Sequence, residues 1–290
     1  LDRLSILFEG VYMDNEIFLN GEKIFTWPYG YSQFEIDLTS YVKEGENTIW
    51  VKNTYELPNS RWYPGSGIYR NVWLVRRPAV HFTTDGGYLA AKKEGDAFIL
   101  HADYEIQNDT DSACEVTLCH TVLAPDGKVA GTSKETLTIP CGLTVNKQTM
   151  TFEAPLLWDI ESPNLYTVHS EIIKDETAFD SSDDRFGFRT IAFDPDKGFF
   201  LNGRNVKING SCEHHTLGAL GAAMNREAVR RQLTIMQKMG VNAIRSAHNM
   251  PAPELMGLCD EMGLLLYTES FDMWEHCKTD YDLSLIHISE

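Results

Sequence analysis

From about residue 193 onward, the spacing of apolar residues changes from the two-residue period of strands to alternating strand-like and helix-like segments. VKING (206–210), NAIRS (242–246) and LLLYTE (264–269) are short strand-like runs. The stretches between them repeat apolar residues at helical spacing, and they end at Gly240 and Gly263. Strand, helix, strand, helix, strand predicts parallel βα units, because parallel neighbours need a crossover connection.

Two architectures contain such a run. It would make up roughly three-eighths of a (β/α)8 barrel or half of a doubly wound sheet. No Gly-x-Gly-x-x-Gly motif follows the first strand, so the sequence gives no support for dinucleotide binding. Asn225 is placed to cap the first helix, and Pro253 suits the first turn of the second.

The residues before this region show the patterns of β-strands. In residues 1–78, Asn20 and Gly21 separate two strand-like runs, which is the sequence signal of a two-residue hairpin. Residues 79–192 contain about seven short strands with alternating apolar residues, among them Leu100 and Ile106. We therefore expect two antiparallel β-sandwiches ahead of the βα units.

The composition limits the kinds of partner. The chain has 25 Lys and Arg against 42 Asp and Glu, a formal net charge of −17. Nucleic acids and anionic membrane surfaces bind clustered Lys and Arg, so neither is expected as a partner. No apolar run approaches the ~20 residues that a membrane-spanning helix needs. The six cysteines show no C-x-x-C pair and no metal-ligand spacing, which favours reduced thiols over a disulfide framework.

The sequences at both ends of the chain are unusual. The first residue is Leu1, and the opening stretch lacks the basic and apolar regions of an export signal, so we expect the chain to start inside a strand. The native compartment is therefore open between cytoplasm and periplasm. Residues 283–290, LSLIHISE, are expected to be a non-native tail.

Polar and titratable side chains follow each of the three predicted parallel strands. They are Cys212, Glu213, His214 and His215 after the first, Arg245, Ser246, His248 and Asn249 after the second, and Glu269 and Asp272 after the third. Because the carboxyl ends of parallel strands meet at one edge, a functional site is expected there. There is no Gly-x-Ser-x-Gly or His-Glu-x-x-His motif, so serine hydrolase and zincin chemistry lack their parts. Imidazole and guanidinium groups beside carboxylates, with Trp62, Tyr63 and Trp274, suit a neutral polyhydroxylated ligand. For the two tryptophans, packing at a domain seam is an equally open interpretation.

Several stretches resemble one known family, glycoside hydrolase family 2. NAIRSAHNMPAPELMGLCDEMGLLLYTE resembles its hallmark segment, and NGSCEHHTLGALGAAMNREAVRRQL the segment upstream of it in the β-galactosidase branch. SRWYPGSGIYRNVWL is similar to the end of its N-terminal sugar-binding sandwich, and LWDIESPNLYTVHSEI with RFGFRTI to its immunoglobulin-like domain.

The resemblance implies a multidomain fold. We expect an all-β jelly-roll-like sandwich over residues 1–78, truncated at its N-terminus, and an immunoglobulin-like β-sandwich over 79–192. Residues 193–282 would be the first ~3 βα units of a (β/α)8 TIM barrel, itself truncated.

The activity implied by the resemblance is that of a retaining exo-β-glycosidase, with a carbohydrate of the β-galactoside type as substrate. Such enzymes use two carboxylic acids ~5–5.5 Å apart. A β-glucuronidase of the same family is one alternative, and a non-catalytic carbohydrate-binding or interaction protein built from β-sandwiches is another.

The resemblance also assigns roles to individual residues. His214, His248 and Asn249 would bind the sugar, and Arg245 would orient the nucleophilic carboxylate. Asn59 and Arg61 would also bind the substrate, from a loop of the first domain that reaches the active site. Glu269 and Asp272 would lie in supporting positions.

The family's two catalytic residues have no counterpart in this sequence. The acid/base Glu follows the fourth barrel strand and the nucleophilic Glu ends the seventh, so no catalytic residue is assigned and the 290-residue fragment is expected to be inactive. No cofactor is required. The family pattern leaves Mg²⁺ open for the full-length enzyme, but only His276 aligns with its ligands, so no metal is assigned. Family members are often dimers or tetramers, which leaves a homo-oligomer open for the full-length protein.

Overall fold

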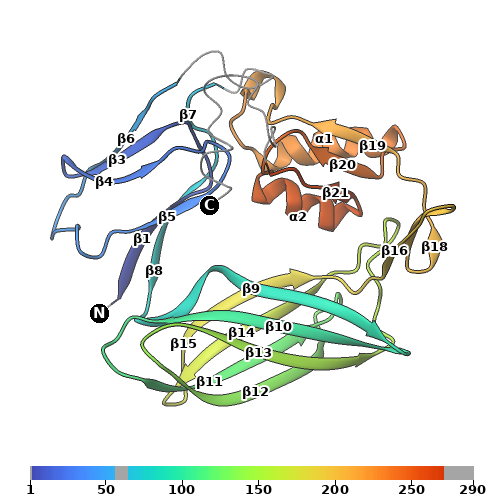
Figure 1. The fold of residues 1–290 in the computed structure, drawn as a ribbon, viewed down its shortest axis with the longest axis horizontal. Helices are drawn as coiled ribbons and strands as arrows, with labels where there is room; N and C mark the ends of the chain where they lie inside the picture. The colour runs from blue at the N-terminus through green and yellow to red at the C-terminus, as the bar shows by residue number, and fades with distance from the viewer. Residues whose placement is uncertain (1, 56–64, 271–290) are drawn as a thin grey trace. The chain divides into compact units, whose positions relative to one another are not determined.

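The computed structural model describes residues 2–55 and 65–270 (Figure 1). Contacts between Cα atoms divide the chain into two compact units. In the described part of the chain, the first unit comprises residues 2–3, 76–208 and 260–263, and the second comprises residues 4–55, 65–75, 209–259 and 264–270.

The second unit begins with a small antiparallel sandwich, as the sequence predicts. Its sheets have the strand orders β5-β1-β8 and β4-β3-β6, and β2 pairs with β7. The strands are β1 (Arg3–Phe8), β2 (Val11–Tyr12), β3 (Asn15–Leu19), β4 (Glu22–Trp27), β5 (Phe34–Asp37), β6 (Ile49–Asn53), β7 (Gly67–Ile68) and β8 (Val72–Arg77). Alternate residues of the strands, such as Phe8, Ile17 and Phe34, are buried and form the core between the sheets.

The predicted hairpin lies between β3 and β4. These strands pair antiparallel, with Leu19 opposite Glu22. Asn20 and Gly21 have φ angles of 53° and 88°, the left-handed region that a type I′ hairpin turn requires at both positions.

The rest of the second unit consists of parallel βα units, which confirms the change of period seen in the sequence. The sheet has the order β19-β20-β21, and both strand pairs are parallel. Its elements in chain order are β19 (Gly210–Glu213), the 3₁₀ turn η1 (Gly218–Leu220), α1 (Arg226–Lys238), β20 (Ala243–Ser246), α2 (Pro253–Met262) and β21 (Leu265–Tyr267). The helices lie beside this sheet in Figure 1.

Local signals fix the start of α1 as expected. The Asn225 side chain accepts a hydrogen bond from the backbone N–H of Ala228 at 3.0 Å, and Val229 and Leu233 are the buried residues of the helix. Gly240, with φ of 90°, follows its C-terminus.

The first parallel strand lies further along the chain than the sequence predicts. VKING was expected to form it, but the strand spans Gly210–Glu213, where Cys212 is opposite Arg245 of β20. The apolar pattern indicates only that a strand lies in this part of the chain. Its exact position depends on where the backbone can pair with β20, and this pairing begins at Gly210. As a result, Cys212 and Glu213 belong to the strand itself and not to the loop after it.

The first unit contains the second sandwich, with the seven strands that the sequence predicts. Its sheets have the orders β13-β10-β9 and β12-β11-β14-β15 and face one another (Figure 1). The strands are β9 (Val80–Glu94), β10 (Ala97–Asn108), β11 (Cys114–Leu123), β12 (Val129–Ile139), β13 (Gly142–Glu153), β14 (Tyr166–Lys174) and β15 (Thr177–Phe186). The alternation along β10 is confirmed, since Leu100, Tyr104 and Ile106 are all at most 1% exposed. Several strands are longer than the short ones expected, and β9 has 15 residues.

A three-stranded antiparallel sheet follows this sandwich and has no counterpart among the sequence-based expectations. It consists of β16 (Ile191–Asp194), β17 (Gly198–Leu201) and β18 (Arg204–Asn205). Asn202 and Gly203, both with positive φ, form its second turn. This Asn-Gly pair is the same hairpin signal as at residues 20–21 and could have revealed it.

Other expectations concern the chain as a whole. In the described residues, Cys114, Cys119, Cys141, Cys212 and Cys259 are free thiols. None of the helices in the described ranges has the length and apolar character needed to cross a membrane. The expected domain bounds at residues 78 and 192 stay predictions, and the expected tail at 283–290 lies outside the described residues.

Candidate functional site

The carboxyl edge of the parallel sheet brings together five of the residues expected there. His214 follows β19, Arg245 lies in β20, His248 and Asn249 follow β20, and Glu269 follows β21. All five belong to the second unit. We call this group the strand-end cluster.

Arg245, His248 and Glu269 form the hydrogen-bonded centre of the cluster. Arg245 Nη2 donates to Glu269 Oε1 at 2.6 Å, and His248 Nδ1 lies 3.1 Å from Glu269 Oε2. The backbone N–H of Glu269 also donates to Ser246 Oγ at 2.9 Å. With a guanidinium and an imidazole on its two oxygens, this carboxylate is suited to orienting its neighbours and not to attacking a substrate.

The two contacts of His248 Nδ1 determine how the ring is protonated. The same nitrogen lies 3.1 Å from Arg245 Nη2, which is a donor, and 3.1 Å from the carboxylate, which is an acceptor. We assign the proton to Nδ1, because a hydrogen bond to a charged carboxylate is the stronger of the two. Glu269 therefore holds the imidazole ring in one orientation.

His214 completes the exposed side of the cluster. Its ring meets that of His248 edge-on, with ring centroids 5.4 Å apart. Burial lowers the pKa of His214, and the nearby His248 and Arg245 lower it further. His214 is thus a neutral donor or acceptor near neutral pH, suited to hydroxyl groups.

Asn249 is the buried member of the cluster and contacts a residue that the sequence did not single out. The hydroxyl of Tyr29 lies 2.8 Å from Asn249 Oδ1 and 2.8 Å from the carbonyl oxygen of Ser270. Asn249 is only 3% exposed. Its role in the described structure is therefore to support the loop after β20, while direct contact with a sugar remains a prediction.

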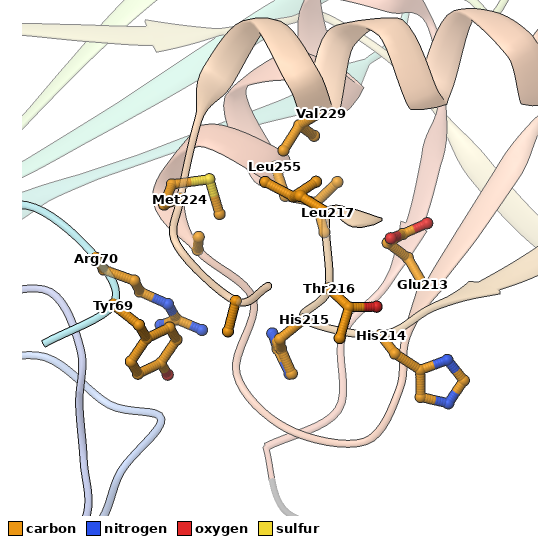
Figure 2. Close-up of a pocket in the computed structure, with 12 residues that line it drawn as sticks. Tyr69, Arg70, Glu213, His214, His215, Thr216, Leu217, Met224, Val229 and Leu255 are labelled. Carbon is orange, nitrogen blue, oxygen red and sulfur yellow. The ribbon is translucent and has the colours of Figure 1, made fainter. Parts of the chain in front are cut away.

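The loop that begins at His214 lines a small pocket (Figure 2). Figure 2 shows Tyr69 and Arg70 on one side of it, the Glu213 carboxyl group on the other, and His215 between them. The volume of about 30 Å³ admits a water molecule but no sugar ring. This pocket is therefore part of the support of the cluster and not the substrate site.

Burial changes the ionisation of two side chains in this pocket. It raises the pKa of Glu213 to about 7, although Gln232 Nε2 donates to Glu213 Oε1 at 2.7 Å and opposes the shift. Burial also lowers the pKa of His215 to about 3, and the Arg70 charge adds to this shift. His215 is therefore neutral, and its ring packs on that of Tyr31 with centroids 4.9 Å apart.

Sequence reasoning missed Tyr29, Tyr31, Tyr69 and Arg70 as residues of the site. Arg70 is part of SGIYRNVWL, which we assigned only to the end of the first sandwich. A charged residue in an otherwise apolar strand-like stretch was the available signal, because buried Arg is rare unless its donors are satisfied.

Other expected residues are not placed. Asn59, Arg61 and Asp272 lie outside the described residues, as do Trp62, Tyr63 and Trp274. Within residues 2–55 and 65–270, no group of three or more His, Cys, Asp or Glu side chains has a geometry that could hold a metal ion.

Comparison with known proteins gives close matches along nearly the whole chain. It is 42% identical over 281 residues to a protein from Bacteroides ovatus named beta-galactosidase BoGH2A, and 37% identical over 282 residues to a putative beta-glucuronidase from Formosa agariphila. The alignments cover 96% of this chain but only 33% and 26% of those proteins. The chain therefore spans about a third or less of the length of these curated relatives.

Solved structures agree with these sequence matches. A glycosyl hydrolase family 2 member from Bacteroides cellulosilyticus superposes with a TM-score of 0.94 at 32% identity, covering 98% of this chain and 37% of that one. A beta-glycosidase from Bacteroides vulgatus gives a TM-score of 0.90 at 35% identity, covering 98% of this chain and 36% of that one. The multidomain fold with a partial TIM barrel is thereby confirmed.

Three sequence models of a single family match consecutive parts of the chain. The model of the sugar binding domain of glycosyl hydrolases family 2 matches residues 2–78, and the model described as glycosyl hydrolases family 2 matches residues 88–189. The model of the family's TIM barrel domain matches residues 195–283. These matches, the relatives and the superposed structures agree, and the chain belongs to glycosyl hydrolases family 2.

Proposed function

We propose that the complete protein is a retaining exo-β-glycosidase that hydrolyses terminal β-galactosides. The observation that carries the proposal is the strand-end cluster, in which two imidazoles and a guanidinium converge on the carboxyl edge of the sheet. The 42% identical relative from Bacteroides ovatus, which is named a beta-galactosidase, supports this choice of sugar.

Each residue of the cluster has a part in this proposal. The imidazoles of His214 and His248 donate to or accept from sugar hydroxyl groups, and Glu269 keeps His248 in the orientation needed. Arg245 presents a guanidinium whose charge keeps a neighbouring carboxylate ionised. No cofactor is needed.

The catalytic carboxylates are assigned by the family resemblance to segments after the fourth and at the end of the seventh barrel strand. Imidazole and guanidinium groups bind a sugar but do not replace a carboxylate as nucleophile at the anomeric carbon. We therefore propose that residues 1–290 by themselves bind sugar weakly and do not hydrolyse it.

A β-glucuronidase is the second candidate. Two relatives from Formosa agariphila, 37% and 31% identical, are named putative beta-glucuronidases. The carboxylate of a glucuronide needs a cationic partner, yet in the described cluster Arg245 is already paired with Glu269 at 2.6 Å. This pairing favours a neutral sugar.

NMR titration of the 290-residue chain tests the choice of sugar. Methyl β-galactoside is added to protein with ¹³C-labelled histidines, and methyl β-glucuronide is added in parallel. The expected result is a shift of the His214 and His248 ring signals with the galactoside only. In an H248A variant, the His214 signal should not shift. A stronger response to the glucuronide would favour the second candidate, and no response to either sugar would contradict a glycoside site here.

A further inference from the structure

Three consecutive residues between β7 and β8 each contact a different part of the βα region. The carbonyl oxygen of Tyr69 accepts from the backbone N–H of Met224 at 2.8 Å. Arg70 Nη2 donates to the carbonyl oxygen of Met250 at 2.7 Å. The side-chain amide of Asn71 donates a hydrogen bond to the carboxylate of Glu254 in the first turn of α2. One short segment of the sandwich thus holds the loop after β19, the loop after β20 and the start of a helix.

Arg70 is the most confined of the three. It is only 6% exposed, and its Nη1 donates to the carbonyl oxygens of Tyr31 at 2.9 Å and Glu9 at 3.3 Å. Its guanidinium lies 5.0 Å from the centre of the Tyr69 ring. Gly10 leaves room for this side chain, because a Cβ at that position would lie 2.8 Å from Arg70 Cδ. Contacts within the sandwich therefore hold the Arg70 guanidinium in one position, from which it also bonds the βα region.

The two loops held by this segment are those that carry the imidazoles. Met224 ends the loop that begins at His214, and Met250 follows His248 and Asn249 directly. Tyr29 supports the second loop at Asn249, as described above. Both loops are thus held by the first sandwich, the loop after β19 through the Tyr69 backbone and the loop after β20 through the Arg70 and Tyr29 side chains.

We propose that Arg70 is a positioning residue of the candidate site, which fixes the loop after β20 relative to the loop after β19 and so sets the separation of the His214 and His248 rings. The proposal rests on the proposed function only in taking these two rings as sugar-binding groups. The separation at issue is the 5.4 Å between ring centroids. Charge-assisted hydrogen bonds in a buried setting suit this role, because they are strong and directional where water is excluded. A ligand that bridges two loops requires this kind of prior alignment.

The proposal is tested by ¹³C-histidine NMR of the 290-residue chain with an R70Q variant. The readouts are the nuclear Overhauser contact between the His214 and His248 rings and the pH at which each ring titrates. In R70Q we expect the contact to be lost and the titration midpoint of His214 to rise by about 0.5 pH unit or more, since the ring would become more solvated. R76Q is the matched control, because Arg76 is a neighbouring guanidinium whose side chain is 76% exposed.

Two further variants keep the test decisive if R70Q does not fold. R70K retains the charge but not the fork of donors, and Y29F removes only the hydroxyl group that contacts Asn249. Each is expected to weaken the contact between the rings partly. If a folded Arg70 variant is less stable but keeps the ring contact and both titration midpoints, Arg70 has a purely structural role and the proposal is wrong.

Sugar titration separates this proposal from the proposed function. If the wild-type chain binds no sugar but the rings move apart in R70Q, the positioning role stands and the glycosidase proposal fails. If methyl β-galactoside binds equally well to wild type and R70Q and the rings do not move, the positioning role fails. The expected result is binding about tenfold weaker in R70Q than in R76Q.

Discussion

Replacing Glu213 with glutamine should stabilise the protein at alkaline pH and leave its stability in acid nearly unchanged. Glu213 is 9% exposed, and burial raises its pKa from 4.5 to about 7. Its hydrogen bond from Gln232 is available to a glutamine carbonyl as well. The substitution therefore removes the ionisation and keeps the shape and the contact.

The magnitude follows from linkage between protonation and folding. Below pH 4.5 the carboxyl group is protonated in both the folded and the unfolded chain and contributes no pH dependence. Between pH 4.5 and about 7 the unfolded chain has lost this proton and the folded chain keeps it, so stability falls as pH rises. The difference of about 2.5 pKa units corresponds to about 3 kcal/mol of stability, fully lost above pH 7.

Urea unfolding of wild type and E213Q at several values between about pH 4 and pH 8.5 measures this effect. The free energy of unfolding of E213Q should exceed that of wild type by up to about 3 kcal/mol above pH 7, and the two should converge near pH 4. E227Q is the control, because the Glu227 side chain in α1 is 75% exposed. A difference between E213Q and wild type that does not vary with pH would refute the reasoning.

Two other substitutions test features of the fold. His120 is fully buried in the second sandwich, where its Nδ1 lies 2.7 Å from Ser170 Oγ and burial lowers its pKa to about 4. Above pH 6.5 His120 is neutral in both the folded and the unfolded chain, so it costs no stability. As the pH falls from 6.5 through 4, the free energy of unfolding decreases by about 3 kcal/mol. In H120Q, the free energy of unfolding measured in urea should depend less on pH between these values than in wild type. The same dependence on pH in both proteins would contradict this prediction. Asn225→Ala should destabilise by about 1 kcal/mol and speed amide exchange in the first turn of α1, whereas Asn225→Ser should preserve both. Equal protection of that turn in the alanine variant would argue against the cap.

Much of the fold follows from local patterns in the sequence. The hairpin at Asn20 and Gly21 and the cap at Asn225 depend on residues close together in the chain. The parallel strands β19, β20 and β21 were predicted from the alternation of short strand-like and helix-like segments. Backbone preferences and apolar periodicity act over such short distances, and therefore leave a readable signal. The start of β19 was misplaced because strand pairing, a long-range event, decides where a ladder begins.

The candidate site was predictable only on the side that the parallel strands supply. His214, Arg245, His248 and Glu269 meet because strand ends share an edge, which is a rule of topology. That Arg245 would bind Glu269, and that Glu269 would orient His248, depends on side-chain directions that spacing does not reveal.

The sequence by itself determined the order of two sandwiches and parallel βα units, the family, and the strand-end residues, because each depends on local periodicity or on a contiguous motif. Only the tertiary structure decided which side chains support that edge. Arg70 and Met250 are separated by 180 positions in the chain, and Tyr29 and Asn249 by 220. No periodic pattern links residues so far apart. Their contacts exist because the sandwich and the βα region of the second unit fold against each other, and burial there sets the charge states of Glu213 and His215.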